Sequence, residues 1–238
     1  MSSPGSRHWL RWVIIGVAFV AVVAVGGPFI YIHLIEGKAP APLSLKGSSS
    51  PTASAQGTSP APAGPVAGTW TIASGSEVGY RVKEVLAGQD NIAVGRTKSV
   101  TGHLTIKGTS VTAGTFTVQM STVKSDQSQR DAQFDGRIMA VATYPTSTFT
   151  LVSPISLAPV PAAGTVQKYP AAGKLTLHGQ TRPVTFTLSA ERTSTAIKVS
   201  GSIPVTFAKW GISNPSFGSF VTTENHGELE FLLTFARS

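Results

Sequence analysis

The sequence contains no cysteine and few charged residues. None of its 238 residues is cysteine, which excludes a disulfide scaffold, a thiolate zinc site and a thiol nucleophile. Charged residues make up only 13%, about half the usual share, which excludes a coiled coil or a long charged helix. The fold must therefore be held by packing of the 41% of residues that are hydrophobic.

Enzyme motifs are also missing from the sequence. It has no phosphate-binding loop, no G-x-S-x-G, no H-E-x-x-H and no C-x-x-C. The five histidines are not paired at metal-ligand spacing. Asp126, Asp131 and Asp135 lack the alternating spacing and the glycine turn of a calcium loop. We therefore expect a protein that is not an enzyme, with no catalytic residue, no metal and no cofactor.

The net charge of +8 does not indicate a nucleic-acid-binding protein. The basic side chains of residues 67–238 are scattered singly along the chain. Surfaces that bind nucleic acid instead carry basic clusters interleaved with aromatic residues. We therefore expect no nucleic-acid partner.

Residues 1–36 have the pattern of a membrane anchor. The uncharged run at residues 12–32 is long enough to span a bilayer at ~1.5 Å per residue. A cleaved signal peptide is the alternative, but its apolar region is only ~7–15 residues long. Arg7 and Arg11 precede the run, so the positive-inside rule places the N-terminus in the cytoplasm. We predict a single-pass protein of the cell membrane with an extracytoplasmic C-terminal domain.

Residues 37–66 are rich in proline, alanine, serine and glycine. They contain too few large side chains to form a core, which is typical of a disordered segment. We predict that they form a tether without packed structure, which keeps the following domain near the outer face of the membrane.

The remaining residues, 67–238, show the period-2 alternation of β-strands. Val78, Tyr80 and Val82, for example, alternate with polar or small residues. About eight main strands of this kind follow one another, each with one apolar and one polar face. Their apolar residues lie at 78–82, 100–106, 116–120, 149–151, 175–177, 184–190, 197–205 and 229–235. Pro204 falls within the seventh strand, which predicts an edge, a bulge or a corner there. The pattern predicts an all-β domain.

One stretch between residues 126 and 142 departs from this alternation. Phe134, Ile138 and Val141 lie at the spacing of an apolar helical stripe. Asp126 and Gln129 are suited to the start of a helix. We expect a short helix across one end of the sheet.

Alternation alone leaves two architectures open, a two-sheet sandwich and a closed barrel with its apolar face inside. Gly102, Gly173, Gly201 and Ala190 lie among the large residues of the apolar face. These small residues leave room for an open lumen. Small residues at barrel corners are an equally good explanation.

Three polar residues are candidates for contacts with a ligand. His178 lies in the predicted turn LTLHGQT, where we expect it to bond local backbone, with a ligand contact as the alternative. Arg130 and Asp131 are adjacent and must point to different sides, so we expect them to have different partners. A structural ion pair is the first interpretation for them, and a polar contact at the mouth of a pocket is the second.

An ordered set of motifs resembles the YceI-like family over about residues 68–237. These motifs are S-x-V-x-Y at Ser76–Tyr80, V-x-G-x-L at Val100–Leu104, S-x-V-x-S at Ser121–Ser125, RD at Arg130-Asp131, YP…TF at Tyr144–Phe149, G-x-L-T-L-H-G-x-T-x-P-V at Gly173–Val184 and F-x-x-x-G-I at Phe207–Ile212. The sequence departs from the family at two places. A histidine that many members carry is replaced around Glu84 or Val85, and the usual F-G-I is Trp210-Gly211-Ile212.

The resemblance implies an extended lipocalin-like antiparallel eight-stranded barrel with a short helix, here preceded by one transmembrane helix. It implies that the barrel binds a long-chain isoprenoid or similar lipid without catalysis. Family members are commonly periplasmic or secreted, so an anchored chain looks like a Gram-positive, actinobacterial version. The alternative function is a filled-core β-domain that acts as an adhesion or scaffold module of the cell envelope.

The predicted partners are therefore a lipid in the lumen and the membrane, through residues 12–32. Arg130, Asp131 and His178 are the candidates for the polar mouth. The predicted lumen residues share the apolar faces of the strands and of the helix: Val78, Tyr80, Val82, Val100, Leu104, Ile106, Phe116, Val118, Met120, Phe134, Ile138, Phe149, Leu151, Leu175, Leu177, Val184, Phe186, Leu188, Ile203 and Phe231.

Overall fold

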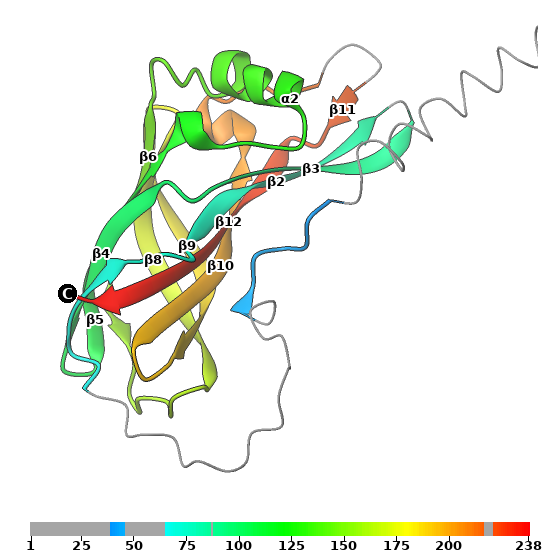
Figure 1. Ribbon diagram of the computed structural model, residues 1–238. Coiled ribbons are helices and arrows are strands. Elements are labelled where there is room, and N and C mark those ends of the chain that lie inside the picture. Colours follow the sequence, from blue (N-terminus) through cyan, green and yellow to red (C-terminus); the bar gives the residue numbers. More distant parts are fainter. Residues whose placement is uncertain (1–38, 46–64, 87, 217–220) are drawn as a thin grey trace, which may run out of the picture.

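The computed structural model of the chain describes residues 39–45, 65–86, 88–216 and 221–238 (Figure 1). Within these ranges, no helix is long and apolar enough to cross a membrane. The predicted anchor at residues 1–36 lies outside the described residues and stays a prediction.

Antiparallel strands close into an eight-stranded barrel, as predicted (Figure 1). The ring runs β1-β4-β5-β6-β8-β9-β10-β12, and β12 pairs back to β1 through Trp70 and Arg237. The closure decides between the barrel and the sandwich. The ring strands are β1 (Gly68–Ile72), β4 (Val100–Lys107), β5 (Ser110–Gln119), β6 (Thr146–Leu151), β8 (Val166–Leu177), β9 (Gln180–Arg192), β10 (Ala196–Thr206) and β12 (His226–Arg237).

The same sheet continues beyond the ring. Strand β2 (Glu77–Leu86) pairs with residues 228–232 of β12, whereas β1 pairs with residues 235–237. Strands β3 (Gln89–Thr97) and β11 (Val221–Thr223) both pair with β2. A short β7 (Ile155–Ser156) pairs with β5. The sheet therefore contains twelve strands. The barrel is extended on the side of the β2–β3 hairpin.

The predicted set of eight strands included β2 and missed β1 and β3. Strand β1 has only five residues, of which Trp70 alone is buried, so it shows too little alternation to be recognised. In β3, three successive residues at 93–95 are buried, which hides the period of two. The prediction was therefore correct in the number of ring strands and wrong in their membership.

The helical segment lies across one end of the barrel, as expected (Figure 1). It consists of α2 (Ser128–Gln133) and a π-helical turn, η4 (Phe134–Ile138). The predicted start at Asp126 is wrong, because Gln127 is the N-cap residue and makes no side-chain cap. Short 3₁₀ turns, η3 (Met120–Thr122) and η5 (Phe207–Trp210), follow β5 and β10 at this end.

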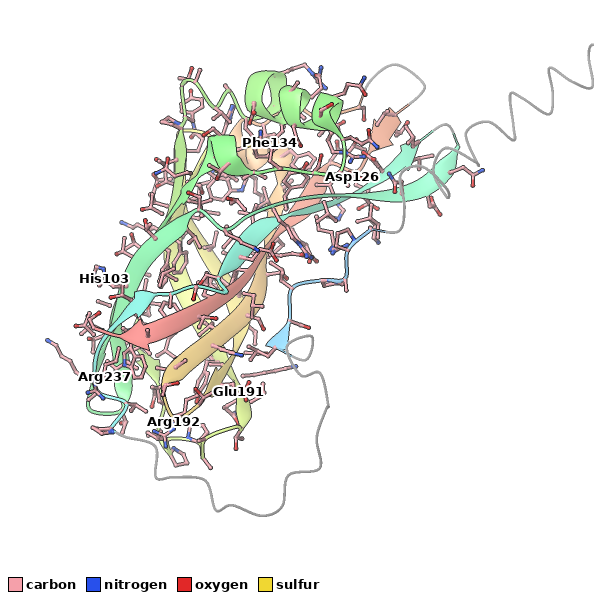
Figure 2. All side chains as sticks on the ribbon, viewed as in Figure 1. His103, Asp126, Phe134, Glu191, Arg192 and Arg237 are labelled. Atoms are coloured by element: carbon pink, nitrogen blue, oxygen red, sulfur yellow. The ribbon has the colours of Figure 1, made fainter. Side chains whose placement is uncertain are left out.

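The hydrophobic core has two clusters stacked along the barrel. The cap cluster, at the helical end of the barrel, includes Leu177, Trp210 and Phe134, which Figure 2 labels. The base cluster, at the other end, includes Leu104 and Phe235. Both are assembled from the inward faces of alternating strands.

Pro204 lies where β10 is paired on one side only. It faces Glu228 of β12, whereas the pairing of β10 with β9 extends only from Ile197 to Gly201. A proline has no amide hydrogen to donate, so it fits a strand that has lost its neighbour. This confirms the predicted edge.

Part of the predicted tether is packed against the barrel. Residues 39–45 lie on the outer face, and Leu45 is only 5% exposed. Arg81 donates to the carbonyl oxygen of Pro40, and Arg96 donates to that of Ala41. In this segment the structure differs from the predicted tether without packed structure, because its carbonyl groups accept hydrogen bonds from the folded domain. Residues 46–64 of the predicted tether lie outside the described residues.

The residues just before β1 contribute to the stability of the barrel. Val66 is buried in the base cluster, and its carbonyl oxygen accepts a hydrogen bond of 2.9 Å from Trp70 Nε1. Arg237 donates to the carbonyl oxygens of Pro65 and Ala67. These contacts tie both ends of the domain together.

We therefore expect a protein that starts at Pro65 to fold alone into a β-protein. One that starts at Gly68 should lose about 1–3 kcal/mol of unfolding free energy, because the Val66 side chain and three hydrogen bonds to backbone carbonyl groups are removed. Far-UV circular dichroism with chemical denaturation measures both. A helical spectrum, or equal stability of the two proteins, would contradict this expectation.

Candidate functional site

The barrel encloses a cavity of about 310 Å³ with an almost wholly apolar wall. Its lining comes from both the cap cluster and the base cluster, so the cavity follows the length of the barrel. Cavities of this size and lining are typical of small-molecule sites. The alternation of the strands creates it, because every second side chain points inward.

Almost all predicted lumen residues lie along this cavity. Val184 is the exception, because it packs against the cap cluster instead of lining the cavity. The predicted residues that line the cavity are Val78, Tyr80, Val82, Val100, Leu104, Ile106, Phe116, Val118, Met120, Phe134, Ile138, Phe149, Leu151, Leu175, Leu177, Phe186, Leu188, Ile203 and Phe231.

Further lining residues were not predicted. One group shares the alternating faces of β10 and β12, so the pattern alone could have found it: Ile197, Val199, Val205, Leu229, Leu233 and Phe235. A second group has no such signal, because it lies in β3, in the short β7 or in connecting segments: Ala93, Ile155, Leu157 and Ile212.

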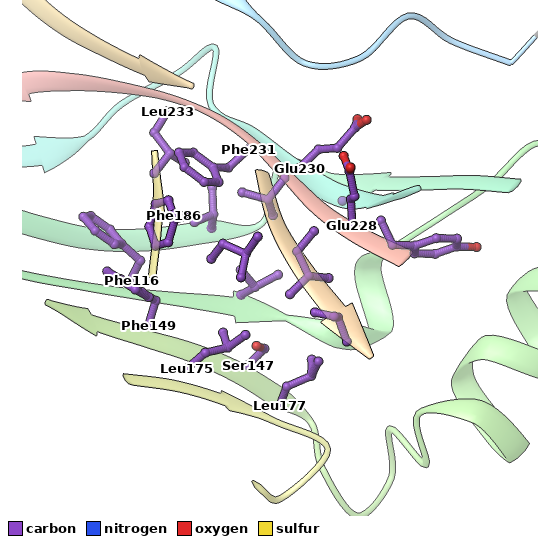
Figure 3. Close-up of a pocket in the computed structure, with 18 of the residues that line it drawn as sticks. Phe116, Ser147, Phe149, Leu175, Leu177, Phe186, Glu228, Glu230, Phe231 and Leu233 are labelled. Carbon is purple, nitrogen blue, oxygen red and sulfur yellow. The ribbon is translucent and has the colours of Figure 1, made fainter. Parts of the chain in front are cut away.

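Five phenylalanine rings form a belt inside the barrel. Phe116 contacts Phe235 with ring centroids 5.6 Å apart and lies 6.4 Å from Phe149. Phe186 lies 5.6 Å from Phe149 and 5.7 Å from Phe231. Figure 3 shows four of these rings, from β5, β6, β9 and β12, gathered at one part of the cavity. The belt gives the cavity a wall of rigid aromatic surface.

The glycines of the apolar face do not open the lumen. A Cβ atom on Gly173 would lie 2.2 Å from the ring of Phe149, and one on Gly201 would lie 2.7 Å from the ring of Phe231. Aromatic rings therefore occupy the space above these glycines. The interpretation that the small residues leave room is wrong for them, whereas Ala190 does line the cavity.

The comparisons with known proteins agree with this architecture. Residues 70–235 match the YceI-like domain. The chain belongs to the YceI-like family. A comparison with curated proteins finds no match.

Two solved structures share the fold of this YceI-like chain. One is described as a polyisoprenoid binding domain from Saccharophagus degradans implicated in plant cell wall breakdown. It is 17% identical, with a TM-score of 0.59, and the match covers 72% of this chain and 99% of that one. The other is BcnA of Burkholderia cenocepacia, 20% identical with a TM-score of 0.53, covering 68% and 98%. At these identities the likeness establishes the fold.

Arg130 is the predicted polar residue that reaches the cavity of this YceI-like barrel. It lines the cavity, lies 17% exposed, and donates from Nη2 to Glu84 Oε1 at 3.2 Å. Its Nη1 also pairs with Asp126. Glu84 lies near the position where many family members carry histidine, and in this chain it pairs with Arg130.

The other two mouth candidates do not line the cavity. Asp131 accepts hydrogen bonds from the backbone nitrogen of Ser125 at 2.8 Å and from its hydroxyl at 2.7 Å. Arg130 and Asp131 therefore have different partners, as predicted. His178 has φ +49° in the turn after β8, and its Nδ1 lies 3.2 Å from the carbonyl oxygen of Trp210. His178 therefore lies in the predicted turn, but its backbone partner is 32 residues away and not local as expected. Neither Asp131 nor His178 lines the cavity.

The Trp210-Gly211-Ile212 departure belongs to the core. Trp210 is 3% exposed and Ile212 is 7% exposed, both in the cap cluster. Gly211 has φ +65°, a conformation that glycine adopts without strain. The indole of Trp210, which is larger than the ring of the usual phenylalanine, thus packs in the cap cluster.

Two tyrosines that line the cavity, Tyr169 and Tyr80, have a raised pKa, and the larger shift is that of Tyr80. Burial raises the pKa of its phenol far above the usual range, and the nearby Arg130 guanidinium only partly opposes this. Its ring is stacked on Phe134, with centroids 5.2 Å apart. The phenol is therefore neutral at physiological pH.

Carboxylates outnumber guanidinium groups along the cavity wall. Within the described part of the chain, the charged lining residues are Glu84, Arg130, Glu228 and Glu230. Figure 3 shows Glu228 and Glu230 extending from β12 away from the phenylalanine belt. The described residues also contain no group of three or more side chains suited to hold a metal ion. The site is thus an apolar cavity with a polar end.

Proposed function

We propose that this YceI-like protein binds a long-chain isoprenoid or similar lipid in the barrel and carries it outside the cytoplasm without catalysis. The observation that carries the proposal is the apolar cavity inside a closed barrel. Each methylene group moved from water into such a cavity contributes about 0.8 kcal/mol. A long apolar chain therefore has enough driving force to bind without a specific set of polar contacts.

Two further observations support a lipid ligand. The related domain from Saccharophagus degradans is described as polyisoprenoid binding. The phenylalanine belt offers flat apolar surface along the cavity, which suits the flat, branched units of an isoprenoid. The alternative of a filled-core adhesion or scaffold module does not account for the cavity.

The charges at the polar end favour a neutral head group. Glu84 and Asp126 both pair with Arg130, so its positive charge is already compensated. These three side chains together carry a net negative charge, which an anionic head group would meet. We infer that the ligand ends in a neutral group, such as a hydroxyl or a quinone.

Native mass spectrometry of the purified protein tests the proposal. We expect a bound apolar mass, and we expect an isoprenyl alcohol to be retained at least 10-fold more strongly than the corresponding isoprenyl phosphate. Lipid-free protein that takes up neither compound would exclude the carrier function. Preferred uptake of the phosphate would contradict the neutral head group, and turnover of a bound lipid would show an enzyme.

We further propose that residues 12–32 anchor the protein in the cell membrane with the barrel outside. Two arginines before an uncharged run support this orientation. Protease added to intact spheroplasts should then remove the barrel. Survival of the barrel until lysis would contradict the proposed orientation.

A further inference from the structure

The outer face of the barrel carries a polar cluster that binds residues 39–45. Arg81 Nη2 donates to the carbonyl oxygen of Pro40 at 2.6 Å, and Arg96 Nη2 donates to that of Ala41. The amide of Leu43 lies 3.4 Å from Glu230 Oε2. In Figure 1 this segment, drawn in blue, runs alongside the barrel from the side of the β2–β3 hairpin. Strands β2, β3 and β12 supply the three side chains.

Glu230 is buried even though it lies on the outward face of β12. It alternates with Leu229 and Phe231, which line the cavity, and yet it is only 4% exposed. A buried carboxylate is costly unless it is paired. Here Arg81 Nε pairs with one oxygen and Arg96 Nη2 lies 3.2 Å from the other.

The two guanidinium groups have more donors than Glu230 can accept. Each group has five N–H donors, and Arg96 also reaches Glu77 at 3.9 Å. The remaining donors suit backbone carbonyl groups. This cluster is therefore built to hold an extended peptide over it.

The sequence of the segment fits such a site. Pro40 and Pro42 have no amide hydrogen, so this stretch offers carbonyl oxygens that no helix or strand ladder uses. Prolines also reduce the conformational entropy that is lost on binding. Leu45, only 5% exposed, adds buried apolar surface at the end of the segment.

We propose that residues 39–45 are a docking strap, bound in cis by Arg81, Arg96 and Glu230, that holds the mouth of the cavity near the membrane. This inference rests on the proposed membrane anchor and lipid-binding function. We take as the mouth the polar end of the cavity, which Glu84 and Arg130 line. Glu84 follows Arg81 on β2 toward the hairpin, so the strap begins at this end of the barrel.

The short segment before the strap limits how far the barrel can move from the membrane. Only residues 33–38 separate the predicted span from the strap. At about 3.6 Å per residue these six residues reach no more than about 22 Å. A free tether over residues 37–66 would instead allow the barrel to move several tens of ångströms away. The strap therefore converts a long tether into a short connection.

Fluorescence quenching of the full chain in lipid nanodiscs tests the strap. Because the chain has no cysteine, Asp90→Cys beside the mouth or Thr195→Cys at the opposite end accepts a single fluorophore. With a quencher on the lipid head groups, we expect at least 2-fold stronger quenching at position 90 than at position 195. Leu45→Asp should remove this difference, whereas Ser44→Asp at an exposed position should keep it.

Thermal melts and isoprenyl alcohol retention are measured on the same variants. Leu45 lies outside the strands and does not line the cavity, so retention should not change in Leu45→Asp, and the thermal midpoint should fall by no more than a few degrees. If no variant retains the alcohol, the proposed function fails while the quenching still tests the strap. Equal quenching at both positions in the otherwise unsubstituted chain, or a difference that survives Leu45→Asp, would overturn the strap.

Discussion

Replacing Gly102 with alanine is expected to destabilise the barrel by more than about 3 kcal/mol. Gly102 has φ +145°, and a Cβ atom there would lie 2.1 Å from the carbonyl oxygen of Thr115. It would also lie 2.8 Å from the ring of Phe116, which faces Gly102 across the β4–β5 pair. The backbone carbonyl cannot move aside without breaking the ladder, so we expect a loss of at least about 6 °C in thermal midpoint.

Gly114→Ala is the matched control on the neighbouring strand. Its added Cβ would meet the ring of Phe116 at 3.5 Å, an ordinary contact, and Gly114 also lines the cavity. We expect a change of less than about 1 kcal/mol. Equal stability of the two variants in thermal melts would show that the β4–β5 pair adapts to a side chain at Gly102.

The contacts between these glycines and their neighbouring strands show what sequence patterns can and cannot predict about the cavity. Alternation identified the inward faces of β4, β5, β8 and β9, because a strand with one buried face has a clear period of two. It could not show that Gly173 lies under the ring of Phe149, since that contact joins different strands. Small residues on an apolar face therefore predict neither an open lumen nor a filled one.

The polar residues show a similar limit. The adjacency of Arg130 and Asp131 correctly predicted different partners. Their partners, Glu84 for one and Ser125 for the other, depend on how the helical segment crosses the barrel end. His178 was placed in its turn by the neighbouring glycine, but its contact with Trp210 is made across the cap cluster. The sequence of residues 37–66 likewise did not predict the docking strap, because one leucine, Leu45, in a proline-rich stretch forms no periodic pattern.

Replacing Phe186 with tryptophan is expected to weaken isoprenoid retention at least 10-fold while the fold stays intact. Phe186 lines the cavity and lies in the middle of the phenylalanine belt, between Phe149 and Phe231. A larger ring there can extend into the cavity, where no packed side chain opposes it. The unfolding free energy should change by less than about 1 kcal/mol, because the added surface fills empty volume.

Val184→Phe provides the control on the same strand. Val184 points to the same side of β9 as Phe186 but packs against the cap cluster, away from the cavity. Extra volume there should cost about 1–3 kcal/mol and leave retention unchanged. Thermal melts and retention of a fluorescent isoprenoid analogue, measured on both variants, separate the two effects. If Phe186→Trp instead lost stability and kept its retention, the belt would be packed shut and the lipid would have to bind elsewhere than in the barrel.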